Sequence, residues 1–111
     1  MAFVSNSSSE SFICDTDLSV EKTKELLIEL LNFYNSFTGN NEKFEDVFEE
    51  PYIGTESDVE YYKYFFGRSN EKRFEKVVGK IIINSVSDNT IPYTLFDFIE
   101  QKFNAFREHL G

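Results

Sequence analysis

Apolar side chains recur at helical spacing between residues 20 and 38. Ser19 stands directly before this stretch, where its hydroxyl can accept a hydrogen bond from a first-turn N–H group. Gly39 follows it and suits the left-handed residue that commonly ends a helix. The pattern predicts a helix over 20–38 with one apolar stripe formed by Val20, Thr23, Leu27, Leu30, Leu31, Tyr34 and Phe37.

A second long helical pattern lies near the end of the chain, after Pro92, which suits a first helical position. Its apolar residues step by about three and four positions, as on one helix face. We therefore expect a helix over 93–109, with Phe103 at the centre of a core stripe made by Phe96, Ile99, Phe103, Phe106 and Leu110.

Three shorter helices are predicted between these two. Phe44, Val47 and Phe48 have the spacing of one helix face, which predicts a helix over 42–49. Pro51 and Gly54 then favour a loop. The sequence Ser57-Asp58-Val59-Glu60 fits a capping box and predicts a helix start at Ser57, with Gly67 near its end and a further helical piece over 70–78.

Two segments favour strands. Residues 80–86 are rich in isoleucine and bounded by turn-forming residues, which predicts a strand, although continuation of the preceding helix is an alternative. Phe12–Cys14 suits a short strand that would pair with it, with helices covering one face. The Ser-rich segment 5–11 is a turn or a linker. We expect an α+β, mainly helical single domain over 1–111, with four to five helices, a minimal two-stranded sheet and a flexible segment over 1–11.

Composition narrows the class of protein. The 111 residues are 41% hydrophobic and 17% aromatic, which excludes a disordered chain, and the net charge is −9. This acidity argues against direct binding of nucleic acid and against docking on an anionic membrane. No apolar run approaches the length of a membrane span, and no secretory signal is expected. A lone cysteine favours a reducing compartment, so we expect a cytoplasmic protein.

Acidic residues concentrate between positions 42 and 60, where Lys43 is the one base. We expect Glu42, Glu45, Asp46 and Glu49 on the outer face of the short helix, with Glu50 beside them. Clustered carboxylates raise the local negative potential and can dock on a basic protein surface, in the extreme case by mimicry of DNA phosphates. The alternative is a solvated surface that keeps a Phe-rich protein soluble.

An aromatic run follows the acidic segment. Tyr61, Tyr62, Tyr64, Phe65 and Phe66 cannot all face one core if they lie on a helix. Tyrosine is common at binding hot spots, so Tyr61, Tyr62 and Tyr64 are candidate partner-binding residues. A second helix covering them, or an interface between copies of this chain, are the alternatives.

Chemistry-bearing residues are sparse. Cys14 and His109 are the single residues of their kinds and stand at opposite ends of the chain. A thiol–imidazole pair would need the termini to meet, whereas a cysteine in an apolar strand is more often a core residue and a histidine in a last helical turn interacts with the helix dipole. No phosphate-binding, zinc-protease or hydrolase motif is present. We therefore expect no enzyme activity, no metal and no cofactor.

The segment 3–13, FVSNSSSESFI, resembles the start of a scattered set of small bacteriophage and bacterial proteins that open with a Ser-rich F-V-S-N-S-S-S-x-S-F run. Parts of the segment 80–111 are similar to the same set. Some of these proteins carry a second cysteine shortly after the position of Cys14, where Asp15 and Thr16 stand here. The resemblance implies a phage or bacterial source and no particular activity.

Together these features lead to one functional hypothesis and one alternative. The hypothesis is a small acidic binding protein, phage-encoded and acting in the host cytoplasm, that docks on a host or phage protein with a basic surface and modulates it. The alternative is a structural or self-assembling protein that uses the aromatic helix as a homo-oligomer interface.

Overall fold

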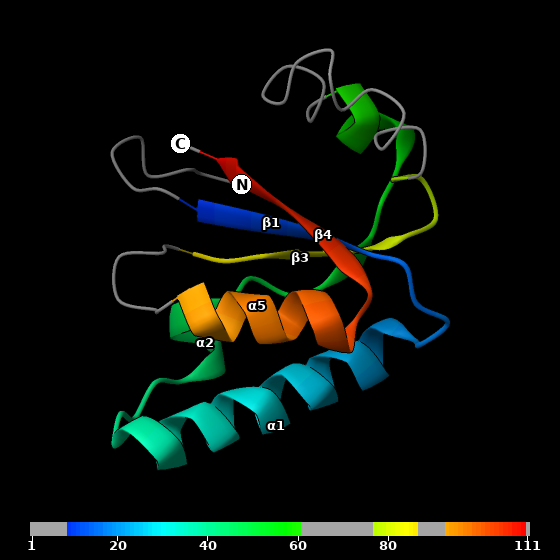
Figure 1. Cartoon of the computed structure of the whole chain (residues 1–111). Helices are drawn as coiled ribbons and strands as arrows, with labels where there is room; N and C mark the ends of the chain where they lie inside the picture. Colours follow the sequence, from blue (N-terminus) through cyan, green and yellow to red (C-terminus); the bar gives the residue numbers. More distant parts are fainter. Residues whose placement is uncertain (1–8, 61–76, 87–92, 111) are drawn as a thin grey trace.

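The protein is an α+β domain in which helices α1, α2 and α5 pack on one face of an antiparallel sheet (Figure 1). The computed structural model describes residues 9–60, 77–86 and 93–110. Four strands, β1 (Ser9–Cys14), β2 (Tyr52–Ile53), β3 (Ile81–Asn84) and β4 (Ala105–Leu110), form a sheet in the order β2-β3-β1-β4. The α+β class is confirmed, but the prediction of two strands is wrong.

The central pairing of the sheet was predictable. β1 runs antiparallel to β3, with Phe12 opposite Ile83 and Ile13 opposite Ile82. This confirms the strand within 80–86 and its pairing with the segment around Phe12. β1 is longer than predicted, however, because it begins at Ser9 inside the Ser-rich segment, and Glu10 and Ser11 are buried in the sheet.

Helix α1 (Val20–Thr38) has the predicted bounds. The Ser19 hydroxyl accepts from the Lys22 N–H at 3.1 Å, and Gly39 adopts a left-handed conformation with φ 77°. The Gly39 N–H donates to the Asn35 carbonyl at 2.8 Å, which completes the C-cap. Both helix ends are therefore fixed by the two residues that the sequence indicated.

The predicted helix over 93–109 is wrong in its second half. Helix α5 spans Tyr93–Lys102, after which Asn104 takes a positive φ of 48° and the chain reverses into β4. β4 pairs with β1 along its whole length, with Cys14 opposite Ala105 and Ser9 opposite Leu110. Pairing satisfies the backbone groups along one side of β1, which a continued helix would leave without strand partners.

The segment between α1 and β2 also differs from the prediction. The helix expected over 42–49 is reduced to α2 (Phe44–Val47), because Phe48 leaves the helix and forms a β-bridge with Ser85. The Pro51–Gly54 region, expected as a loop, contains β2, which pairs with β3. Both changes follow from the edge of β3, whose backbone groups find partners in this segment.

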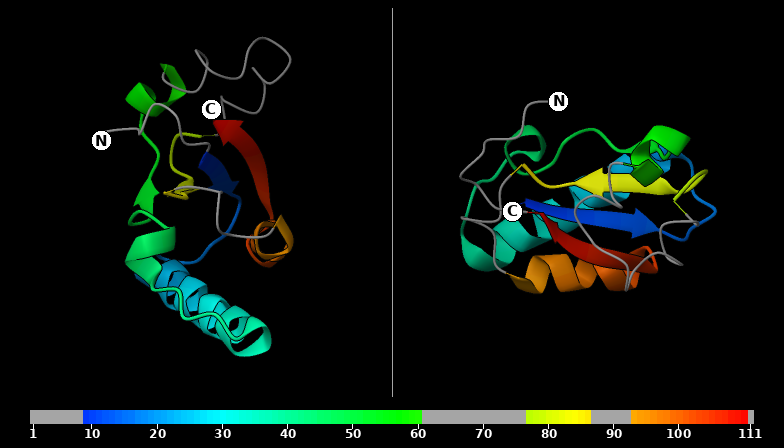
Figure 2. Two further views of the ribbon diagram at one scale, coloured as in Figure 1. Left: turned by 90° about the vertical axis from the view of Figure 1, so that its left-hand side faces the viewer. Right: turned by 90° about the horizontal axis from the view of Figure 1, so that it is seen from above.

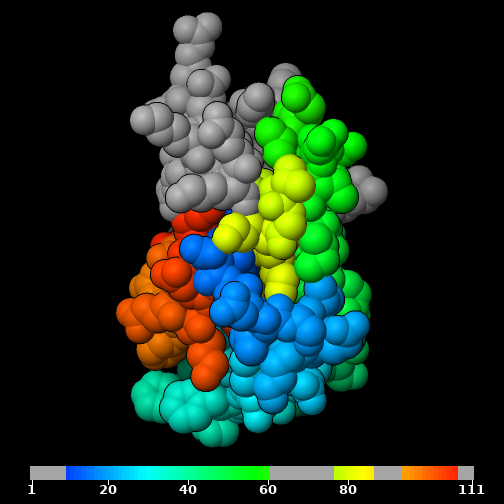
Figure 3. All heavy atoms as spheres, turned by 90° about the vertical axis from the view of Figure 1, so that its right-hand side faces the viewer, coloured from blue at the N-terminus to red at the C-terminus, as the bar shows by residue number. Residues whose placement is uncertain are grey.

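Two hydrophobic clusters lie on opposite faces of the sheet. The larger cluster contacts α1, α2 and α5 and contains Phe12, Leu27, Leu31, Phe96, Ile99 and Phe103. On the other face, Ile13, Val77 and Ile82 form a small buried cluster. The left view of Figure 2 shows α1, α2 and α5 on one side of the strands, and Figure 3 shows β2, β3, β1 and β4 as neighbouring green, yellow, blue and red segments.

The next helix starts earlier than predicted. Residues 56–60 are helical, and the Asp58 carboxylate accepts from the Thr55 N–H at 2.6 Å. The cap therefore joins Thr55 to Asp58 rather than Ser57 to Glu60. Residues 77 and 78, the end of the helix predicted over 70–78, are not helical, and residues 78 and 79 form a turn. The predictions for segments 1–8, 61–76 and 87–92 lie outside the described residues.

The backbone of Gly54, directly after β2, lies close to the backbone of the turn at residues 77–80. Its N–H donates to the Lys80 carbonyl at 2.8 Å, and its carbonyl accepts from the Gly79 N–H at 3.0 Å. A Cβ atom at position 54 would lie 2.3 Å from the Val77 carbonyl oxygen. The position therefore requires glycine for space.

Candidate functional site

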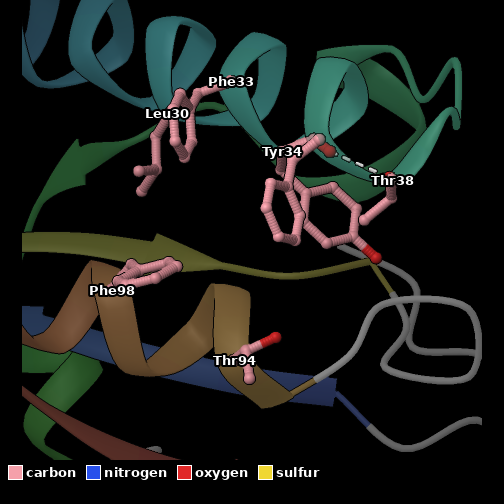
Figure 4. Close-up of a pocket in the computed structure, with 7 residues that line it drawn as sticks. Leu30, Phe33, Tyr34, Thr38, Thr94 and Phe98 are labelled. Atoms are coloured by element: carbon pink, nitrogen blue, oxygen red, sulfur yellow. Dashed lines mark hydrogen bonds between the residues drawn. The ribbon is translucent and has the colours of Figure 1, made fainter.

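An apolar groove opens between α1 and α5. Leu30, Phe33, Tyr34, Phe37 and Thr38 of α1 face Thr94 and Phe98 of α5 around a cavity of about 220 Å³. Figure 4 shows Leu30 and Tyr34 pointing toward the helix that carries Thr94 and Phe98. The lining is almost wholly apolar, and the Thr38 hydroxyl donates to the Tyr34 carbonyl at 2.8 Å.

Three phenylalanines of this groove are exposed to solvent. Phe37 is 81% exposed, Phe33 63% and Phe98 48%. Single exposed apolar residues are ordinary, but aromatic rings from two helices around one cavity form a contiguous patch of the kind found at protein interfaces. Phe37, which the sequence placed on one apolar stripe with Leu27 and Leu31, is therefore not buried with them.

The groove exists because α1 carries two apolar stripes. Thr23, Leu27, Leu31 and Tyr34 are buried and face the sheet and α5. A second stripe, Leu26, Leu30, Phe33 and Phe37, has the spacing i, i+4, i+7 and i+11 along the side of the helix. Leu26 and Leu30 are half-buried against the main core, whereas Phe33 and Phe37 in the C-terminal half of the stripe remain exposed.

The groove end of α1 has a negative electrostatic character. No base occurs between Lys24 and Lys43, and the last turn of α1 contains none to offset the negative end of the helix dipole. Glu42 is fixed at this end, because the Asn35 side chain accepts from its N–H at 3.0 Å and donates to its carbonyl at 2.8 Å. Across the groove, Asp97 precedes Phe98 on α5, but its carboxylate pairs with Arg107 at 3.4 Å.

The five predicted acidic residues are not arranged as one helical face. Glu45 and Asp46 lie on α2 and are exposed, while Glu42 precedes the helix and is half-buried. Glu49 follows it and is also half-buried, and this partial burial raises the pKa of its carboxyl group. Glu50 forms an ion pair with Lys24 at 2.6 Å, and the Lys24 ammonium also lies 5.1 Å from the centroid of the Phe44 ring.

These placements leave Glu45, Asp46 and Glu50 as the exposed carboxylates of the predicted set, with Glu50 paired to Lys24. The structure therefore divides the five: two point into solvent, two are partly covered and one is ion-paired. Tyr61, Tyr62 and Tyr64 lie outside the described residues.

Phe33 and Phe98 were missed by the sequence analysis. The available signal was the width of the apolar arc of α1, since Leu26, Ile28, Leu30, Phe33 and Phe37 extend it beyond the face that one core can cover. For Phe98 the sequence offered no signal beyond its place next to the buried stripe of α5.

Cys14 and His109 are not brought together. In the β1–β4 pairing, Cys14 lies opposite Ala105 and His109 lies opposite Glu10, so their backbone positions are four residues apart, about 13 Å along the strands. Cys14 is fully buried, and burial raises the pKa of its thiol to about 12. His109 lies in β4 rather than in a last helical turn.

Across 9–60, 77–86 and 93–110, no three His, Cys, Asp or Glu side chains gather in an arrangement that would hold a metal ion. Among the helices described, none is long and apolar enough to cross a membrane. No protein family, curated protein or solved structure gives a significant match to this chain.

Proposed function

We propose that this chain is a protein-binding domain that engages a partner with a basic surface. The observation that carries the proposal is the convergence of Phe33, Phe37 and Phe98 on one apolar cavity. Exposed aromatic side chains around a concave site supply most of the energy at many protein interfaces. The carboxylates of Glu45 and Asp46 and the overall charge of −9 favour basic partners and accelerate association with them.

This proposal modifies the mechanism expected from the sequence. The acidic segment supplies electrostatic attraction, and the α1–α5 groove supplies the apolar anchor that had been assigned to Tyr61, Tyr62 and Tyr64. Self-association through the groove is the competing function. It is disfavoured by repulsion between two chains that each carry a charge of −9.

Site-directed photo-crosslinking tests the proposal. A photoreactive phenylalanine analogue is placed at Phe37 or Phe98, and as a control at Ile53, which is 48% exposed on β2. We expect both groove positions to crosslink a basic protein from host extract, with less adduct at low salt after Glu45→Lys and Asp46→Lys. Covalent dimers of the chain would favour self-assembly, and adduct yields no higher than at Ile53 would contradict the proposal.

A further inference from the structure

We infer that the occupant of the α1–α5 groove is an amphipathic helix of the partner, with basic residues on the flank that meets the C-terminal end of α1. This inference rests on the proposed function and adds the chemistry and secondary structure of the bound segment. Three features of the groove support it: its two helical walls, the spacing of its apolar side chains and the charge at the C-terminal end of α1.

The backbone of the groove walls favours a helical occupant. Both walls are helices, α1 (Val20–Thr38) and α5 (Tyr93–Lys102), whose backbone groups are paired within each helix except in the terminal turns. An extended segment would bring unpaired N–H and C=O groups onto an apolar lining that offers few partners. A helix satisfies its own backbone and presents only side chains.

The apolar side chains of α1 also have the spacing that a helix recognises. Leu30, Phe33 and Phe37 follow one another at three and four positions along one side of α1. Helices pack by setting side chains at such positions into the gaps between those of a neighbour. A helix lying beside α1 and α5 would bury all three exposed phenylalanines, which matches the helix-in-groove mode of peptide recognition.

The charge around the groove indicates basic residues on the bound helix. The C-terminal end of α1 carries the negative end of a helix dipole with no compensating base in its last turn. Glu42 is held at this end by Asn35. Asp97, which precedes Phe98 on the opposite wall, already pairs with Arg107 at 3.4 Å and adds little to this charge. Lysine or arginine on the bound helix would meet the end of α1 and Glu42, whereas a second copy of this chain, with its net charge of −9, would bring further negative charge.

A designed peptide tests this inference directly. The probe is an amphipathic helical peptide of leucine and lysine with one tryptophan on its apolar face. The chain itself contains no tryptophan, so the emission of the probe reports binding without interference. The first control peptide has the same composition with an alternating pattern that cannot form an apolar helix face, and the second replaces each lysine by glutamate.

The protein variants separate groove binding from general attraction to an acidic protein. Phe37→Ala combined with Phe98→Ala removes two exposed rings of the groove. Ile28→Ala is the matched control, because Ile28 is 36% exposed on α1 and does not line the cavity. We expect the double variant to weaken binding of the lysine peptide by about tenfold or more, and Ile28→Ala to change it by less than about twofold.

Each other result contradicts the inference. Equal effects of the double variant and Ile28→Ala would show that the peptide binds by net charge alone. Equal binding of the alternating peptide would remove the requirement for a helix, and equal binding of the glutamate peptide would remove the requirement for basic residues. If Phe37 and Phe98 crosslink a protein partner while no helical peptide binds, the proposed function stands and this inference fails.

Discussion

The Arg107 guanidinium on β4 reaches back across the reversal at Asn104 and donates from Nε to the Glu100 carboxylate of α5 at 2.9 Å. One of its terminal nitrogens lies 3.4 Å from the Asp97 carboxylate, and its central carbon lies 5.9 Å from the centroid of the Phe96 ring. These contacts fasten the last strand to the helix that precedes it. The orientation of α5 on the sheet, and with it one wall of the groove, depends in part on this contact.

Removing this arginine is expected to lower stability measurably. The Arg107 side chain is 23% exposed, so its ion pairs are less screened than surface pairs. We expect Arg107→Ala to reduce the free energy of unfolding by about 1–2 kcal/mol in urea denaturation. Lys24→Ala, which removes the more exposed pair with Glu50, should cost about 0.5 kcal/mol or less. Similar losses in both variants would contradict the bracing role of Arg107.

The Cys14 thiol is expected to resist modification in the folded protein. Burial raises its pKa to about 12, so the thiol stays protonated at pH 8, and its position in β1 blocks access of reagents. Labelling with a thiol reagent should be slow in buffer and accelerate greatly in denaturant. Rapid labelling of the native protein would show that Cys14 is accessible and would reopen a reactive role for it.

The same thiol gives a pH dependence of stability with a defined sign. The unfolded thiol ionises near pH 9, while the folded thiol stays neutral until about pH 12, so the unfolded state loses its proton first. Stability is therefore unaffected by this group below pH 9 and falls as the pH rises from 9 toward 12. Cys14→Ala should show a shallower decline than the parent chain over this range, measured as thermal unfolding against pH. Parallel curves would mean that the thiol is not desolvated.

Phe103 and Phe98 are expected to respond differently to truncation, although Phe98 lies on α5 and Phe103 directly follows it. Phe103 is 1% exposed in the main core, whereas Phe98 is 48% exposed on the groove. We expect Phe103→Ala to cost about 3–5 kcal/mol and Phe98→Ala about 1 kcal/mol or less. Chemical denaturation of the two variants measures the contrast, and a large loss for Phe98→Ala would place that ring in the core rather than at a binding surface.

Gly54 is expected to be intolerant of any side chain. An added Cβ would lie 2.3 Å from the Val77 carbonyl oxygen, so Gly54→Ala must displace either β2 or the turn at residues 77–80. We expect a loss of about 2 kcal/mol or more, comparable to other overpacked sites. Gly39→Asn is the control, since asparagine tolerates the left-handed conformation of that helix end at small cost. A neutral Gly54→Ala variant would contradict the close approach.

The features that the sequence predicted correctly depend on residues near one another in the chain. Ser19 and Gly39 fix the ends of α1 through hydrogen bonds within four residues, so local chemistry is sufficient. The isoleucines at 81–83 have little freedom outside an extended conformation, which identified β3. In the same way, the apolar neighbours of Cys14 were enough to predict a buried strand.

What the tertiary structure alone decided involves residues far apart in the chain. The stripe Phe96, Ile99, Phe103 continued in step to Phe106, but β1 offered an unpaired edge ninety or so residues upstream, and pairing with it outweighed the local helical period. β2 and the bridge at Phe48 likewise exist because β3 presents its other edge. The groove is a further example. The apolar arc of α1 is wider than the face that one core can cover. Only the tertiary packing of α1, including the position of α5, determined that Tyr34 would be buried while Phe33 and Phe37 remained exposed.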